Sequence, residues 1–150
     1  MSLKEILQAD LNTAIKSRNS VVAETIRMVL TAITNEEVAG KEKKELSDAE
    51  IITVLTREAK KRREAAEAFD AGGRADRAAA ERAEGEVIAG YLPEQLSEDD
   101  VKKLIAETIA AVGAAGPSDM GKVMGSLKAK VAGKADGALV SSLVKEALNK

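Results

Sequence analysis

The residues that come closest to a known chemical motif lie between Gly116 and Lys122. Their order, Gly-Pro-Ser-Asp-Met-Gly-Lys, fits the Gly-x-x-x-x-Gly-Lys part of a phosphate-binding P-loop. The next residue is Val123, where a P-loop needs a Ser or Thr hydroxyl to meet the magnesium ion. Asp119 would also place a carboxylate among the phosphates, and an alanine-rich helix rather than a strand precedes the segment. We therefore exclude a nucleotide-binding P-loop.

Side chains that usually carry catalysis are scarce elsewhere. The chain has no Cys and no His, which excludes disulfides, thiolate nucleophiles, His-based triads and the usual zinc sites. Its carboxylates lie at expected helix starts or beside basic partners, so no acid–base pair stands out. We expect no catalytic residue, no metal site and no cofactor.

Lysines near a predicted turn are the strongest binding candidates. Residues 117–150 carry six Lys against three Asp+Glu, whereas residues 1–96 carry 15 Lys+Arg against 18 Asp+Glu. Within Gly133-Lys-Ala-Asp-Gly137, Gly133 suits a helix C-terminal cap, and Asp136 or Gly137 suits the start of the next helix. Lys134 is then left on the tip beside a helix N-terminus, where it can hold a phosphate or simply be solvated.

A stripe of small residues is expected on the helix before that turn. Gly121, Gly125 and Ala129 recur every four residues. An apolar stripe is expected beside them, formed by Met120, Met124, Leu127 and Val131. Each glycine inside a helix costs about 1 kcal/mol relative to alanine, so a close contact should offset the cost. Another helix backbone or a ligand backbone could supply it, and we favour close helix packing within this part of the chain.

The densest basic cluster lies between Arg57 and Arg63. Three expected pairs at i,i+4 neutralise it: Glu58 with Arg62, Lys60 with Glu64, and Arg63 with Glu67. We interpret the cluster as a solvated helix face rather than a nucleic-acid surface. Aromatic residues for base stacking are limited to Phe69 and Tyr91, so any RNA contact would be to backbone and shape.

The periodicity predicts an all-α protein. Apolar residues recur at helical spacing, and no alternating strand pattern occurs. Seven helices are expected, with starts at Ser2, Ser20, Ser47, Arg74 or Ala75, Ser97, Ser118 and Gly137. Capping boxes are expected for the pairs Ser2 and Glu5, Ser47 and Glu50, and Ser97 and Asp100. Gly40 is expected to end the second helix, and Gly72-Gly73 to break the third from the fourth.

Two domains follow from the break at Pro93. Residues 1–93 should form a multihelical N-terminal domain with a long hairpin at about 57–85, whose facing surfaces are mostly alanine. Residues 94–150 should form a small three-helix domain. No apolar run is long enough for a membrane span and no signal peptide is evident, so we expect a cytoplasmic protein.

Three segments carry a family resemblance. Residues 51–67 (IITVLTREAKKRREAAE), 87–97 (VIAGYLPEQLS) and above all 119–137 (DMGKVMGSLKAKVAGKADG) resemble the GatB/YqeY family, and the stand-alone YqeY-like proteins match along essentially the whole chain. The resemblance implies a three-helix C-terminal domain like the tail of the GatB component of the glutamine-dependent aspartyl/glutamyl-tRNA amidotransferase, which helps hold tRNA.

The resemblance implies an accessory tRNA-binding protein that works beside a tRNA amidotransferase or an aminoacyl-tRNA synthetase. The family label, carbon–nitrogen ligase activity with glutamine as amido-N-donor, is then inherited from the shared module rather than intrinsic. The expected contacts are Lys122, Lys128, Lys130 and Lys134, with Gly121, Gly125, Gly133 and Gly137 allowing close approach. The alternative is a helical protein-interaction module or homo-oligomer, docking through the 57–85 hairpin without nucleic acid.

Overall fold

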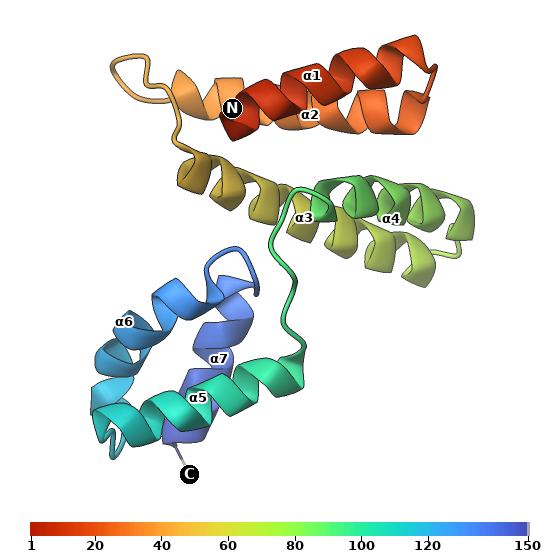
Figure 1. The fold of residues 1–150 in the computed structure, drawn as a ribbon. Coiled ribbons are helices and arrows are strands. Elements are labelled where there is room, and N and C mark those ends of the chain that lie inside the picture. The colour runs from red at the N-terminus through yellow and green to blue at the C-terminus, as the bar shows by residue number, and fades with distance from the viewer. Residues whose placement is uncertain (150) are drawn as a thin grey trace. The chain divides into compact units, whose positions relative to one another are not determined.

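The computed structural model describes residues 1–149, and these residues are helical throughout apart from short connections (Figure 1). The α-helices are α1 (Leu3–Lys16), α2 (Ser20–Glu37), α3 (Asp48–Ala71), α4 (Ala75–Ala89), α5 (Glu98–Val112), α6 (Met120–Val131) and α7 (Gly137–Leu148), with a 3₁₀ turn η1 (Pro117–Asp119) before α6. No strand occurs within residues 1–149, which confirms the predicted all-α fold. None of the helices in this range combines the length and apolarity needed to cross a bilayer.

Helix starts follow short-range side-chain bonds. The capping boxes at Ser47 and Ser97 both form. Each serine hydroxyl accepts from the backbone N–H three residues ahead, and the carboxylate of that residue accepts from the backbone N–H of the serine. At the first helix only half of the expected box forms, because Ser2 Oγ accepts from Glu5 N without a reciprocal bond. These caps satisfy N–H groups that have no partner inside the helix.

Two boundaries of α2 differ from the prediction. Its N-cap is Asn19, whose Oδ1 accepts from Val22 N at 3.3 Å, and Ser20 is already the first helical residue. The helix ends at Glu37 rather than near Gly40. The backbone carbonyl of Glu37 accepts from Lys44 N at 2.9 Å, so the returning chain satisfies the helix end three residues before the glycine.

Contacts divide the chain into two compact units, Met1–Leu92 (unit 1) and Pro93–Lys150 (unit 2). Lys150 itself lies outside the described residues. Unit 1 contains α1–α4, and unit 2 contains α5–α7 with η1. Each unit has its own apolar core made almost wholly of Leu, Ile and Val.

Unit 1 is built from two helical hairpins, α1 with α2 and α3 with α4 (Figure 1). As the sequence indicates, the second hairpin is packed through small residues, with Ala66 and Ala78 buried between its helices. A Cβ added at Gly85 would lie 3.7 Å from Arg62 Cβ, which is ordinary contact. Small residues here let the two helices lie close together with little apolar volume between them.

Glu37 ties three segments of unit 1 together. Its side chain is only 3% exposed, and its carboxylate accepts from Lys4 Nζ at 2.9 and 3.2 Å and from Leu46 N at 3.2 Å. The hydrogen bond from Lys4 and that from the Leu46 amide lower the pKa of Glu37 below its ordinary value of 4.5, against the effect of desolvation. A buried carboxylate with these partners stays ionised, so α1, the end of α2 and the chain entering α3 are linked by one side chain.

The Glu37 tie makes a stability prediction. Lys4→Met should lower the thermal midpoint by several degrees at neutral pH, because it leaves a buried carboxylate without its cationic partner. Lys44→Met removes an exposed pair with Glu50 and should change the midpoint much less. The measurement is thermal unfolding followed by circular dichroism.

Wild type and Lys4→Met should also differ in how their thermal midpoints respond to acid. The pKa of Glu37 is lower in the folded protein than its ordinary value of 4.5. Its contribution to the free energy of unfolding is therefore present above pH 4.5 and is lost as the pH falls through the lower, folded-state pKa. The midpoints of wild type and Lys4→Met should therefore converge in acid. A gap that stays constant down to the acid transition would show that the ion pair does not stabilise unit 1.

Candidate nucleic-acid interface

One face of α6 attaches this helix to unit 2. Val123 and Leu127 are fully buried and Val131 is 8% exposed, at a spacing of four residues. All three belong to the core formed with α5 and α7, and Met120 and Met124 pack against its edge. The predicted apolar stripe therefore needs a correction, because it omitted Val123, which lies at the centre of the buried face.

The opposite face of α6 carries the two glycines and is uncovered. Gly121 and Gly125 are exposed, and a Cβ built at either would meet no atom of the described residues within 4 Å. The predicted close helix packing on this stripe is therefore wrong. At 3.6 residues per turn, the stripe lies across the helix from Val123 and Leu127, so the core cannot cover it.

The energetic balance explains how the helix forms despite the glycines. Burying three aliphatic side chains contributes about 1.5–3 kcal/mol each, whereas two glycines cost about 2 kcal/mol together. Core burial therefore outweighs the glycine cost, and α6 is stable. The cost itself is not offset by any contact among residues 1–149, so the two glycines are unexplained by the folding of unit 2 alone.

The four predicted lysines lie at different places around this helix and its turn. Lys122, Lys128 and Lys130 are exposed, and Lys134 is half-buried in the following turn. Lys128 is seven residues after Gly121 and three after Gly125, which puts it on the glycine face. Lys130 is nine residues after Gly121, about two and a half turns on, which puts it on the opposite side.

The charge of Lys122 acts on the nearby carboxylate of Asp119, but at longer range than an ion pair. No ion pair forms at any of the four lysines within the part of the chain that the structure describes, although Lys102 of α5 pairs with Glu98. Unit 2 has as many acidic as basic residues, eight of each by sequence. Its positive charge is therefore local to α6, the turn and α7, because the acidic residues concentrate at the start of α5.

The turn from Gly133 to Gly137 has the predicted form. Gly133 adopts the left-handed conformation with φ of 72°, and Asp136 caps α7 by accepting from Ala138 N at 3.4 Å. Gly137 is the first residue of α7 and is exposed. Lys134 N donates to the carbonyl of Val131 at 2.9 Å, so the lysine leaves a hydrogen-bonded turn rather than a free loop.

A residue that the sequence analysis did not single out holds this turn. Gln95 Nε2 donates to the carbonyl of Gly133 at 2.7 Å and to that of Pro93 at 2.8 Å. Next to it, Leu96 N donates to the carbonyl of Lys134 at 2.8 Å. No local signal could reveal these bonds to the turn, because their partners are about forty residues away in the chain.

The start of α6 lacks the features of a phosphate cradle. Ser118 does not cap the helix, contrary to the prediction, because it lies within η1 and α6 begins at Met120. Asp119 Oδ2 instead accepts from Ala115 N at 2.8 Å. That bond, opposed by desolvation and aided by Gly116 N–H and the charge of Lys122, lowers the pKa of Asp119. An anion in this position is unfavourable for phosphate.

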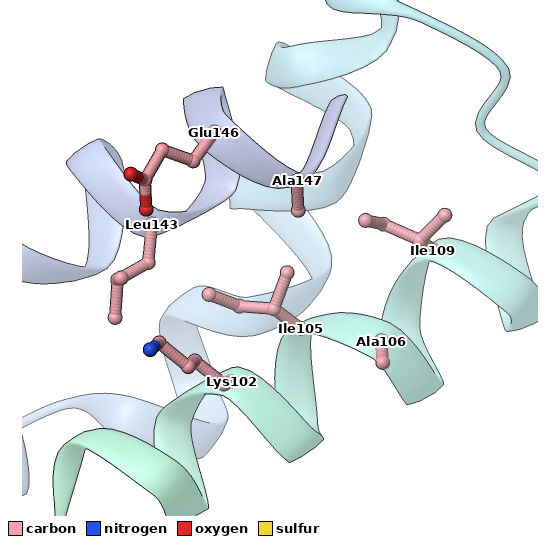
Figure 2. Close-up of a pocket in the computed structure, with 7 residues that line it drawn as sticks. All are labelled: Lys102, Ile105, Ala106, Ile109, Leu143, Glu146 and Ala147. Carbon is pink, nitrogen blue, oxygen red and sulfur yellow. The ribbon is translucent and has the colours of Figure 1, made fainter. Parts of the chain in front are cut away.

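A groove of about 370 Å³ lies between α5 and α7. Figure 2 shows that Lys102 and Ile105 line it from α5, and Leu143 and Glu146 from α7. The titratable residues of its lining are Lys102 and Glu146, and both are exposed. Within residues 1–149 no group of three or more acidic side chains could hold a metal ion.

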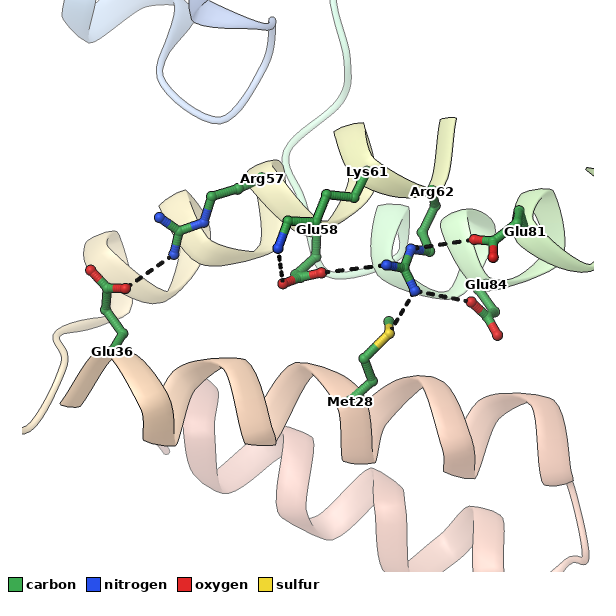
Figure 3. Close-up of polar contacts among 8 residues, drawn as sticks. All are labelled: Met28, Glu36, Arg57, Glu58, Lys61, Arg62, Glu81 and Glu84. Carbon is green, nitrogen blue, oxygen red and sulfur yellow. Dashed lines mark hydrogen bonds and ion pairs between the residues drawn. The ribbon is translucent and has the colours of Figure 1, made fainter. Parts of the chain in front are cut away.

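The basic cluster of α3 is neutralised, as expected, but largely by partners that lie outside it (Figure 3). Arg62 pairs with Glu58 at 3.9 Å, and Lys60 pairs with Glu64 at 4.0 Å. The predicted Arg63–Glu67 pair is not found in the described part of the chain.

The further partners come from other helices. Glu81 and Glu84 of α4 both lie 3.4 Å from the Arg62 guanidinium, and Arg57 pairs with Glu36 of α2 at 3.3 Å. Figure 3 shows Arg62 reaching across from α3 to meet both carboxylates and the sulfur of Met28. The guanidinium of Arg62 is thus enclosed by acidic groups, and most of the positive charge of this cluster is paired.

The uncovered glycine face makes a second stability prediction. Gly125→Ala should raise the stability of the protein by about 0.5–1 kcal/mol, because the new methyl meets nothing and the helix gains propensity. Gly113→Ala is the matched control: it too has open space, but its φ of 66° should make the same change destabilising. Urea unfolding followed by circular dichroism measures both, and a destabilised Gly125→Ala would mean that this face is covered in solution.

Known proteins similar in sequence to this chain indicate its family. The protein named altered inheritance of mitochondria protein 41, mitochondrial, of Pyrenophora tritici-repentis is 28% identical over 144 residues, covering 93% of this chain and 77% of that protein. A protein of Schizosaccharomyces pombe described as uncharacterised is 32% identical over 97 residues, covering 64% of this chain and 76% of its own length. Residues 4–148 match the family of Yqey-like proteins. Since this match spans almost the whole sequence, the chain belongs to the Yqey-like protein family.

Proposed function

We propose that this protein is an accessory tRNA-binding protein that docks RNA on the glycine face of α6. The observation that carries the proposal is the uncovered stripe of Gly121 and Gly125 with Lys128 on the same face. Lys122 flanks this surface, Lys134 follows in the turn after α6, and both lack ion pairs among the described residues. We call the three lysines and two glycines the α6 surface.

The glycines suit a bulky, rod-like ligand. A helix without side chains at two successive turns lets a sugar–phosphate backbone approach the peptide backbone closely. A lysine one turn further along can then contact a phosphate as a point charge. The helix propensity lost at the glycines is thus balanced by a contact made only in the complex, which is common where function opposes stability.

The residues of unit 2 suit recognition of RNA shape rather than of base sequence. Unit 2 has no aromatic residue on which a base could stack, and lysines that contact phosphates carry no direct sequence information. Folded RNA, read through its backbone, fits this surface better than a single strand does. Because residues 119–137 resemble the tail of the tRNA amidotransferase, we propose tRNA as the folded RNA that binds.

The proposed role is accessory rather than catalytic. The chain has neither Cys nor His, and the titratable side chains that line the α5–α7 groove are one lysine and one glutamate, Lys102 and Glu146. Amide-transfer chemistry would come from a partner, such as a tRNA amidotransferase or an aminoacyl-tRNA synthetase. The proposed compartment is the cytoplasm, where that partner and tRNA meet, although the name of one relative includes the word mitochondrial.

Two lysines two residues apart test the proposed face. Lys128→Ala should weaken tRNA binding severalfold and reduce the slope of log affinity against log salt by about one, since one phosphate contact is lost. Lys130→Ala removes the same charge from the opposite side of the same helix and should have a much smaller effect. Fluorescence anisotropy with a labelled tRNA transcript measures both.

Three results of that titration would count against the proposal. Equal losses for the two variants would mean diffuse electrostatic attraction rather than docking on one face. Equal affinity for an unstructured single strand of the same length would contradict shape recognition. No tRNA binding by wild type at low salt would remove the RNA function, and size-exclusion chromatography would then test the homo-oligomer alternative.

Adding a methyl group to the α6 surface tests the close approach itself. Gly125→Ala should weaken tRNA binding at least severalfold while it raises the unfolding free energy, because the methyl occupies the space of the RNA backbone. Gly85→Ala in α4 is the matched control, since its new methyl also fits without a clash in a helix, but the residue lies in unit 1. Unchanged tRNA affinity of a folded Gly125→Ala protein would show that RNA does not touch this face.

A further inference from the structure

The segment that enters unit 2 is hydrogen-bonded to the turn that carries Lys134. We call this segment, Pro93–Leu96, the connector. Leu96 N donates to the carbonyl of Lys134 at 2.8 Å, and Gln95 Nε2 donates to the carbonyl of Gly133 at 2.7 Å. Leu96 also packs against the unit 2 core. Two successive carbonyls of the turn are therefore held by two successive residues of the connector.

The side-chain amide of Gln95 matches its two partners. Its Nε2 lies 2.7 Å from the carbonyl oxygen of Gly133 and 2.8 Å from that of Pro93. Both partners are acceptors, and the NH₂ group, with its two N–H bonds, can satisfy them together. A carboxylate would place a third acceptor between two carbonyls, and an apolar side chain would leave both carbonyls to water.

These bonds restrict the peptide planes from which Lys134 leaves the turn. Gly133 is held in the left-handed conformation, with φ of 72°. Lys134 N donates to Val131 on one side while its carbonyl accepts from Leu96 on the other. The backbone of Lys134 is thereby fixed at both ends, and its long side chain starts from a fixed Cα rather than from a mobile loop.

We propose that Gln95 is a positioning residue for the Lys134 contact, so that the connector forms part of the RNA site. This inference rests on the proposed function. Gln95 is not placed on the RNA itself; it acts by holding the Gly133–Lys134 turn. Binding at Lys134 and hydrogen bonding at the connector then stabilise each other, because coupling between two sites is reciprocal.

Two linked measurements on the full chain test this role. Gln95→Met keeps the length and the neutral charge of the side chain but removes both N–H donors. It should weaken tRNA binding about two- to tenfold, as expected when the hydrogen bond that holds the Gly133 carbonyl is lost. In a Lys134→Ala background the same substitution should have almost no effect, because the contact that it positions is already absent.

The second measurement starts without RNA. Amide hydrogen exchange at Leu96 should be several times faster in Gln95→Met than in wild type, and adding tRNA should then slow this exchange in wild type. Gln8→Met is the matched control, because Gln8 is an exposed glutamine of α1 in unit 1. It should change neither the exchange at Leu96 nor the affinity.

The outcomes separate this inference from the function on which it rests. Equal losses of affinity with and without the Lys134 side chain would overturn the positioning role while tRNA binding stands. Unchanged exchange at Leu96 in Gln95→Met, with normal binding by wild type, would overturn it as well. Absence of tRNA binding by wild type overturns the proposed function, and the inference falls with it, whatever the exchange shows.

Discussion

The packing of Val123, Leu127 and Val131 against α5 and α7 orients everything else on α6. A helix held by one narrow stripe of aliphatic residues has a single rotational setting about its own axis, since rotating it would expose that stripe. Burial of these three side chains therefore determines what the rest of the helix presents. Gly121, Gly125 and Lys128 are turned away from the core as a consequence.

Charge is distributed in opposite ways in the two units. In unit 1 the guanidinium of Arg62 meets three glutamates, and Glu37 meets Lys4 in a nearly closed environment. Such pairs satisfy partly buried charges and keep the helices in register, but paired charges attract a charged ligand only weakly. In unit 2 the lysines of α6 and its turn lack ion pairs within residues 1–149, so their charge stays available.

In both units, carbonyls at the end of a helix or in the turn after it are bonded by another segment of the chain. The last carbonyl of α2 accepts from Lys44 N, and the carbonyls of Gly133 and Lys134 after α6 accept from Gln95 and Leu96. Carbonyls at the C-terminus of a helix have no partner within it, so the chain must supply one. In unit 1 this places a carboxylate for Lys4, and in unit 2 it places a lysine beside the start of α7.

The sequence by itself determined what depends on neighbours within about four residues. The all-α pattern, the capping boxes at Ser47 and Ser97, the left-handed Gly133 and the cap at Asp136 all arise from such short-range bonds. Tertiary structure decided the rest: that the glycine stripe is open, that Arg62 pairs with Glu81 and Glu84, and that Gln95 holds the turn. These features join residues about twenty to forty positions apart or depend on which stripe of a helix is buried, and local spacing carries no information about either.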